Sequence, residues 1–109
     1  MPFSEDMADT MREDLGIQPG LSEKKMFGGL CFLLHGNMVC GVHNGGAMYR
    51  PGKEREPEAL DAGASPLSFT GRPMGGMVEI DTGEFADDDL RAKLTELSLT
   101  NAASLPPKG

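Results

Sequence analysis

Residues 30–43 read Leu-Cys-Phe-Leu-Leu-His-Gly-Asn-Met-Val-Cys-Gly-Val-His, and this segment sets the architecture of the chain. β-Branched, aromatic and other apolar residues dominate it, and Gly36-Asn37 interrupts them where a two-residue turn between strands would lie. We therefore predict a β-hairpin in which Leu33 faces Cys40. One face of that hairpin carries Cys31, Leu33, His35, Met38, Cys40 and Val42, and the other carries Leu30, Phe32, Leu34, Val39, Gly41 and His43.

The middle of this hairpin is apolar on both faces, which is typical of a central strand pair that is covered on each side. We expect helices to cover one face and a neighbouring subunit to cover the other. The turn residues Asn44-Gly45-Gly46 lead to Ala47-Met48-Tyr49-Arg50, a short third strand that completes an antiparallel meander. Pro51-Gly52 then ends that strand.

A helix is predicted before the meander. Ser4 is a typical N-cap, Glu5 and Asp6 place negative charge in the first turn, and Gly16 follows the last apolar position. Between these limits the apolar residues recur at helical spacing, at Met7, Ala8, Met11 and Leu15. The spacing predicts a first helix with one buried stripe.

A second long helix is predicted near the C-terminus. Its apolar stripe consists of Ala86, Leu90, Leu94 and Leu97. Two acid–base pairs at four-residue spacing favour this helix further, and they are Asp87 with Arg91 and Asp89 with Lys93. The run Asp87-Asp88-Asp89 is best explained as a cap that meets the exposed amides at the helix start.

The segment between the meander and the last helix gives weaker signals. Residues 56–63 predict a brief helix, residues 64–76 are rich in glycine and proline and predict irregular structure, and residues 77–80 predict a strand with 66–69 as its weaker partner. The expected fold class is α+β, with an antiparallel sheet of a three-stranded meander plus one or two further strands, flanked by N- and C-terminal helices. We expect a single domain over residues 1–109, with a core over 4–100 and a flexible tail over 101–109.

The charge balance of the 109-residue chain limits its partners. Asp and Glu number 17 against 10 Lys and Arg, which gives a formal charge of −7. This charge repels phosphate backbones at long range, so direct nucleic-acid binding is not expected. The longest apolar run, residues 30–34, is too short to span a membrane, and the acidic N-terminus does not resemble a secretory signal. We therefore expect a cytoplasmic protein that does not enter a membrane.

The two cysteines, Cys31 and Cys40, lie in apolar segments and are expected to be reduced, buried thiols. In the predicted register they share a face with His35, while His43 lies on the other face. A zinc site or a Cys–His nucleophile pair is therefore an open alternative, but neither the usual ligand spacing nor an orienting acid is present. We expect no metal, no cofactor and no catalytic residue.

Four short motifs carry a resemblance to a known family. They are Lys25-Met26-Phe27-Gly28-Gly29, Met48-Tyr49-Arg50, Gly63-Ala64-Ser65-Pro66 and Gly71-Arg72-Pro73-Met74. In this order, the chain resembles the TfoX/Sxy N-terminal-domain family over residues 7–99. The resemblance implies an α+β fold with an antiparallel sheet flanked by helices. The family takes its name from longer regulators of genes for natural DNA uptake, which carry a second domain, so a stand-alone N-terminal domain is expected here.

Three residues are candidates for binding. Arg72 lies between Gly71 and Pro73, where its guanidinium could be presented to a carboxylate or phosphate, although a local ion pair is the commoner role of a loop arginine. Tyr49 and Arg50 are either an exposed contact pair or ordinary residues at a sheet edge.

Two functions follow as hypotheses. The first is a non-catalytic interaction or regulatory module that binds a protein partner or forms a homodimer. The second is a small anionic-ligand binder or minor enzyme, with a pocket near the Arg72 loop, between the sheet and residues 64–76.

Overall fold

The computed structural model describes the chain except for residues 1–3, 27–28, 44, 70–71 and 107–109, and it also leaves undescribed the side chains of residues 26, 68, 69 and 72–74. One antiparallel sheet has the strand order β1-β2-β3-β4-β6-β5. The strands are β1 (Leu21–Met26), β2 (Gly29–Leu34), β3 (Asn37–His43), β4 (Gly46–Tyr49), β5 (Ser65–Phe69) and β6 (Arg72–Asp81). The helices are α1 (Glu5–Leu15), α2 (Glu56–Ala62), α3 (Thr82–Phe85) and α4 (Asp88–Ser104).

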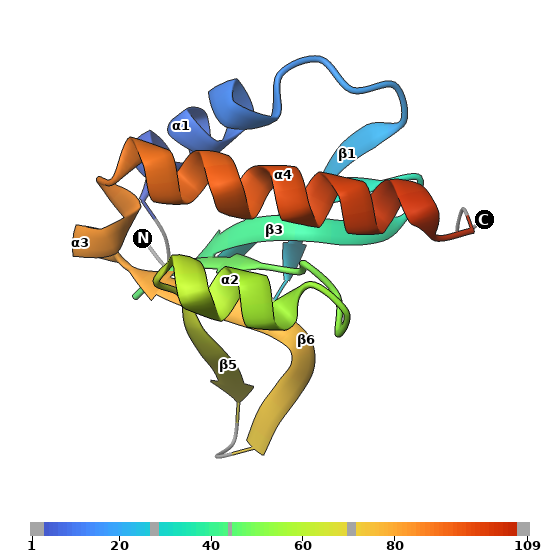
Figure 1. Cartoon of the computed structure of the whole chain (residues 1–109). Coiled ribbons are helices and arrows are strands. Elements are labelled where there is room, and N and C mark those ends of the chain that lie inside the picture. The colour runs from blue at the N-terminus through green and yellow to red at the C-terminus, as the bar shows by residue number, and fades with distance from the viewer. Residues whose placement is uncertain (1–3, 27–28, 44, 70–71, 107–109) are drawn as a thin grey trace.

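The helices α1, α2 and α4 lie on the same side of the sheet, with α4 running across β3 between the other two (Figure 1). The predicted α+β class, with an antiparallel sheet and helices near both ends of the chain, is therefore confirmed. None of the helices in the described part of the chain combines the length and apolar character that crossing a membrane requires.

The first helix forms as its sequence indicates. The Ser4 hydroxyl accepts a hydrogen bond from the Met7 amide, and Gly16, with φ 66°, ends the helix by donating its amide to the Arg12 carbonyl at 3.0 Å. Ala8, Met11 and Leu15 are buried, so the predicted stripe faces the sheet.

The register of the central hairpin differs from the predicted one. Leu34 pairs with Asn37, so the turn residues are His35 and Gly36, both with positive φ (52° and 84°), as a type I′ turn requires. The pairing then shifts between Phe32 and Leu33, because β3 contributes one extra residue at this point, and Phe32 pairs with Cys40. The predicted Leu33–Cys40 pair is therefore wrong.

This bulge places the two cysteines on opposite faces of the sheet. The prediction that they share a face is therefore wrong. Cys40 packs in the core beneath the helices, next to Phe32, whereas Cys31 packs on the other face. A single unpaired residue in one strand inverts the facing of every side chain beyond it. The expectation that both thiols are free and buried is confirmed.

Both faces of the sheet are buried, as predicted. The face without helices carries a cluster of Cys31, Met38, Met48, Leu67 and Met77. Leu67 belongs to β5 and Met77 to β6, so the last hairpin contributes to covering the far face. Because these side chains are already buried within one chain, a neighbouring subunit is not needed to cover them, contrary to our expectation.

Two segments differ from the expectation. The predicted pairing of residues 66–69 with 77–80 is confirmed, since Pro66 of β5 pairs with Val78 of β6, but residues 72–76, which were expected to be irregular, form the first part of β6. β1 was not predicted at all, and it makes the sheet one strand wider than the expected maximum. Its residues 22–25 are polar, charged and exposed, so the strand lacks the apolar alternation that would reveal it, as edge strands often do.

The C-terminal helices also differ in detail. Asp87 caps α4, as predicted, by accepting hydrogen bonds from the amides of Asp89 and Leu90. The predicted four-residue ion pairs do not form, because Arg91 pairs with Asp14 and Asp88, and Lys93 pairs with Glu58. Ala86 is exposed and lies outside the stripe, whereas α4 continues to Ser104, into the segment expected to be a tail.

Candidate functional site

Tyr49 does not lie at the surface. It is fully buried beneath α4, and burial raises the pKa of its phenol well above the ordinary value. The phenol oxygen has no hydrogen-bond partner among the described residues. The exposed contact pair that we considered for Tyr49 and Arg50 is therefore not formed, because the Tyr49 side chain belongs to the core.

The structure describes Arg50 in full but only the backbone of Arg72. Arg50 is half-buried at the end of β4, where its amide donates to the Val39 carbonyl at 2.9 Å and its carbonyl accepts from the Asn101 side chain at 3.3 Å. The backbone of Arg72 begins β6 opposite Phe69, but the Arg72 side chain lies outside the described residues. The binding role of Arg72 stays a prediction.

The thiols and imidazoles do not converge. Burial raises the pKa of Cys31 to about 11 and that of Cys40 well above its ordinary value, so neither is a thiolate nucleophile at neutral pH. His35 is exposed in the hairpin turn, and His43 accepts a hydrogen bond at Nδ1 from the Gly45 amide at 3.1 Å. Within the described ranges, no group of three His, Cys, Asp or Glu side chains is arranged to hold a metal ion.

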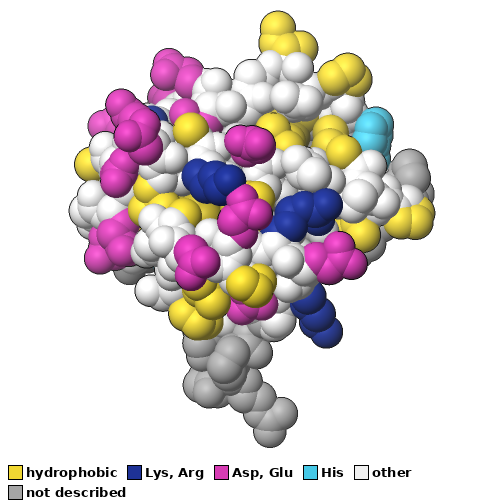
Figure 2. Space-filling model, in the orientation of Figure 1, with side chains coloured by type: hydrophobic (Ala, Val, Ile, Leu, Met, Phe, Trp, Pro, Cys, Tyr) yellow, Lys and Arg dark blue, Asp and Glu magenta, His cyan; other side chains and the backbone are white. Residues whose placement is uncertain are grey.

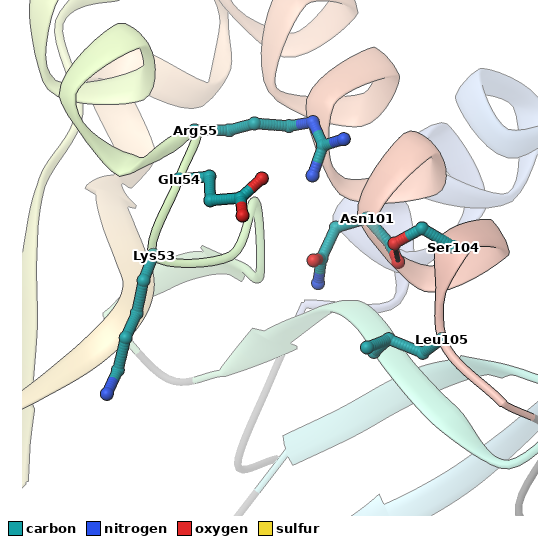
Figure 3. Close-up of a pocket in the computed structure, with 6 residues that line it drawn as sticks. All are labelled: Lys53, Glu54, Arg55, Asn101, Ser104 and Leu105. Carbon is teal, nitrogen blue, oxygen red and sulfur yellow. Dashed lines mark hydrogen bonds between the residues drawn. The ribbon is translucent and has the colours of Figure 1, made fainter.

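A hollow of about 360 Å³ lies between the loop that precedes α2 and the end of α4. The loop contributes Lys53, Glu54 and Arg55, and the helix end contributes Asn101, Ser104 and Leu105 (Figure 3). The Glu54 carboxylate and the Arg55 guanidinium both point toward the hollow, whereas the Lys53 ammonium points away from the helix (Figure 3). The hollow thus presents one positive and one negative group beside an amide and an apolar side chain.

The loop that carries these charges is held from three sides. Gly52 donates its amide to the Gly76 carbonyl of β6 at 3.1 Å, and the Gly76 amide donates to the Glu56 carboxylate of α2 at 2.9 Å. On the third side, α4, the Asn101 amide donates to the Arg50 carbonyl. Gly52 has φ 88°, and a Cβ there would lie 2.3 Å from Asn101 Oδ1, so this approach requires glycine.

A second hollow, of about 180 Å³, has in its lining two acidic residues, Asp81 and Glu84, that already have a structural role. Its Asp81 side chain accepts from the Glu84 amide at 2.7 Å, and the Glu84 side chain accepts from the Asp81 amide at 2.9 Å. This capping box starts α3 and occupies both carboxylates.

The amino-acid sequence matches the model of the TfoX N-terminal domain over residues 13–102, which is most of the chain. The chain belongs to the TfoX N-terminal domain family. This confirms the resemblance that the four short motifs indicated. No protein in the curated set matches the chain.

The family match covers part of the larger hollow in this TfoX N-terminal domain. Residues 53–55 and Asn101 lie within the matched range, whereas Ser104 and Leu105 lie beyond its end. The sequence does not indicate this hollow, because its two walls are almost 50 residues apart and no motif links them. The available signal was the Pro51-Gly52 pair, which indicated a turn next to three charged residues.

Proposed function

We propose that this TfoX N-terminal domain is a non-catalytic interaction or regulatory module that acts through protein contacts, with a second copy of the chain as its simplest partner. The proposal is supported by the free edge of the sheet at β1. This strand pairs with β2 on one side, and no other described strand lies on its other side. A second strand could add there through backbone hydrogen bonds.

Ile17 gives this edge an apolar contact point. It lies in the loop that connects α1 to β1, and it is 99% exposed, more than any other large hydrophobic side chain in the described part of the chain. A large exposed apolar side chain in the loop that leads into an open edge strand suits a contact in which the strand pairs and the side chain fills a partner's pocket. On the face shown in Figure 2, acidic and basic side chains are interspersed among apolar ones. That mixture suits protein contacts better than a phosphate backbone.

The same arrangement supports a role without catalysis. The two thiols are buried on opposite faces of the sheet and have raised pKa values. A nucleophile needs an exposed, activated side chain with a base within hydrogen-bonding reach. Neither thiol meets these requirements.

Sedimentation equilibrium up to about 1 mM protein tests this function. We expect the wild-type chain to self-associate and Ile17→Lys to weaken that association by at least about tenfold in Kd, because a charge replaces the apolar contact. Ala62→Lys is the matched control, since it adds the same charge at an exposed position on α2. A strictly monomeric wild type that also captures no partner protein would contradict the proposal.

The second candidate is a small anionic-ligand binder or minor enzyme with Arg72 as the anion contact. The segment near Arg72 is a hairpin of β5 and β6, which gives the arginine a defined backbone position. A thermal-shift screen of metabolites separates the two candidates. A stabilising ligand whose effect is lost in Arg72→Ala favours the binder, and no stabilisation by any ligand favours the module.

A further inference from the structure

We propose that the hollow between residues 53–55 and the end of α4 binds a free α-amino acid with an apolar side chain. The proposal is independent of the partner contact at β1, because the hollow is built from other residues. It rests on the two opposite charges that face the hollow, on its apolar wall, and on the way its loop is fixed.

Two opposite charges, those of Glu54 and Arg55, face the hollow. Glu54 and Arg55 are neighbours in the chain, yet neither forms an ion pair with the other or with any other residue in the described ranges. A guanidinium offers a planar fork of donors that matches a carboxylate, and a carboxylate accepts hydrogen bonds from an ammonium group. A ligand that carries both groups can satisfy Arg55 and Glu54 together.

Simpler charged ligands fit the hollow less well. A phosphate or a dicarboxylate would be attracted by Arg55 and repelled by Glu54, while Lys53, which also lines the hollow, directs its ammonium away from α4 (Figure 3). A simple amine would meet the converse conflict, with attraction by Glu54 and repulsion by Arg55. A ligand with one kind of charge is therefore repelled by one of the two groups that face the hollow, so the hollow favours a ligand that carries both charges.

The opposite wall of the hollow is formed by the end of α4 and by Leu105, which follows it. Leu105 is half-buried, and its side chain reaches toward the hollow (Figure 3). The Ser104 hydroxyl donates to the Asn101 carbonyl at 2.6 Å, so it is committed to the helix end and offers no strong donor to a ligand. At about 360 Å³, the hollow lies near the lower end of the range for small-molecule sites, which suits a compact ligand.

The backbone of the loop is fixed before any ligand arrives. Pro51 is buried, Gly52 is hydrogen-bonded to β6 and packed against Asn101, and the Arg55 amide donates to the Gly52 carbonyl at 3.1 Å. A fixed backbone lowers the entropy lost on binding, since only the two side chains need to be ordered.

Isothermal titration calorimetry with three related probes tests the proposal. L-Leucine carries both charged groups, 4-methylpentanoate lacks the ammonium, and 3-methylbutan-1-amine lacks the carboxylate. We expect leucine to bind at least about tenfold more tightly than either analogue, because only leucine satisfies Glu54 and Arg55 together. No binding of leucine at millimolar concentration, or equal binding of the three probes, would overturn the proposal.

Two variants sharpen the test by changing one charge each. Arg55→Gln is expected to weaken both leucine and 4-methylpentanoate by about tenfold or more. Glu54→Gln is expected to weaken leucine but to strengthen 4-methylpentanoate, since it removes the negative charge that repels the carboxylate. Lys24→Gln is the control and should change the leucine Kd less than about threefold, because Lys24 is exposed on β1 and does not line the hollow.

Each of these positions is exposed or half-buried, so the variants should retain the wild-type melting temperature, which is checked first. If Glu54→Gln leaves the preference for leucine over 4-methylpentanoate unchanged, Glu54 does not bind the ammonium group and the proposal fails. Inorganic phosphate that binds more tightly than leucine would also overturn it.

Discussion

Three buried hydroxyl groups, those of Tyr49, Thr95 and Ser98, have no hydrogen-bond partner among the described residues. Other helical hydroxyls do have one, since Thr10 donates to the Asp6 carbonyl at 3.0 Å and Thr100 to the Glu96 carbonyl at 2.8 Å. Thr95 lies near the Tyr49 phenol and lowers its pKa, but burial raises that pKa by more. The two hydroxyl groups are not in hydrogen-bonding geometry. Tyr49 therefore stabilises the fold through its ring and not through its hydroxyl.

Removal of the Tyr49 hydroxyl should change the stability of the fold only slightly. We expect Tyr49→Phe to change the free energy of unfolding by less than about 1 kcal/mol, because no protein hydrogen bond is lost. Tyr49→Ala should cost about 3–5 kcal/mol, since it leaves a cavity beneath α4. Urea unfolding followed by circular dichroism measures both changes. A loss above about 2 kcal/mol in Tyr49→Phe would show that the hydroxyl makes a stabilising contact.

Gly52 should not tolerate a side chain. Its φ of 88° is unfavourable for other residues, and a Cβ would lie 2.3 Å from Asn101 Oδ1. We expect Gly52→Ala to destabilise the fold by about 1–3 kcal/mol. Gly83→Ala is the control, because a Cβ there meets its nearest neighbour at 3.4 Å and the residue lies in α3, where alanine is favoured. Thermal unfolding of both variants tests the difference, and equal losses would contradict it.

At the scale of elements, Arg91 joins three helices. Its Nε donates to Asp14 of α1 at 2.9 Å, its Nη1 donates to the Phe85 carbonyl at the end of α3 at 2.8 Å, and its Nη2 pairs with Asp88 of α4 at 2.8 Å. The guanidinium also lies over the Phe85 ring, 5.2 Å from its centre. The side chain is only 11% exposed, so these contacts are partly shielded from water.

A lysine at position 91 cannot make the same set of contacts as Arg91. We expect Arg91→Lys to cost about 2 kcal/mol, because one ammonium cannot reach Asp14, Asp88 and the Phe85 carbonyl together. Lys93→Arg is the control, since Lys93 is more exposed and makes its ion pair only with Glu58. Guanidinium unfolding of the two variants gives the comparison. An unchanged midpoint in Arg91→Lys would mean that the helices are held by their apolar contacts alone.

The tie between α1 and β1 should depend on pH. Arg12 donates two hydrogen bonds to Glu23, at 2.8 and 2.9 Å, and these bonds hold the pKa of Glu23 below its ordinary value. Because the pKa is lowered by folding, the stabilisation is present above the ordinary carboxyl pKa and is lost as the pH falls through the lowered value. The Glu23 side chain is 40% exposed, so the pair should contribute less than about 1 kcal/mol.

NMR titration of the Glu23 carboxyl measures this effect directly. In Arg12→Gln the pKa of Glu23 should rise toward its ordinary value, because the charged donor is lost. The stability difference between the wild type and Glu23→Gln should be present at pH 7 and absent at strongly acidic pH. A difference that persists unchanged in acid would show that the Glu23 contribution does not come from its charge.

At the scale of the whole molecule, the sheet separates two hydrophobic clusters. Cys40 belongs to the cluster beneath the helices and Cys31 to the cluster on the far face, and both are buried. Both clusters pack on the same central strands, so the loss of one cluster removes support from the other. We expect the domain to unfold as one cooperative unit.

Thiol labelling tests this cooperativity. Under native conditions both cysteines should react with a thiol reagent at the rate of global opening, so mass spectrometry should detect unlabelled and doubly labelled chains without an accumulated single adduct. Labelling should accelerate with urea as the free energy of unfolding falls. Selective labelling of Cys31 without urea would show that the far cluster opens on its own.

The sequence by itself determined the features that depend on neighbours in the chain. The Ser4 and Asp87 caps, the stripes of α1 and α4, the short helix α2 and the apolar meander were all predicted, because their signals lie within a few residues of each other. The family was also evident from four short motifs, and the match over residues 13–102 shows it.

Only the tertiary structure decided the features that depend on which strands pair and which elements pack together. The extra residue in β3 and the edge strand β1 follow from which backbones pair, and local sequence patterns do not encode this pairing. The hollow combines residues 53–55 with the end of α4. Arg91 pairs with Asp14 of α1, whereas the sequence predicted a pair with Asp87, four residues before it. The hollow and the Arg91–Asp14 pair join residues that are distant in sequence, so the packing of the whole chain determines them.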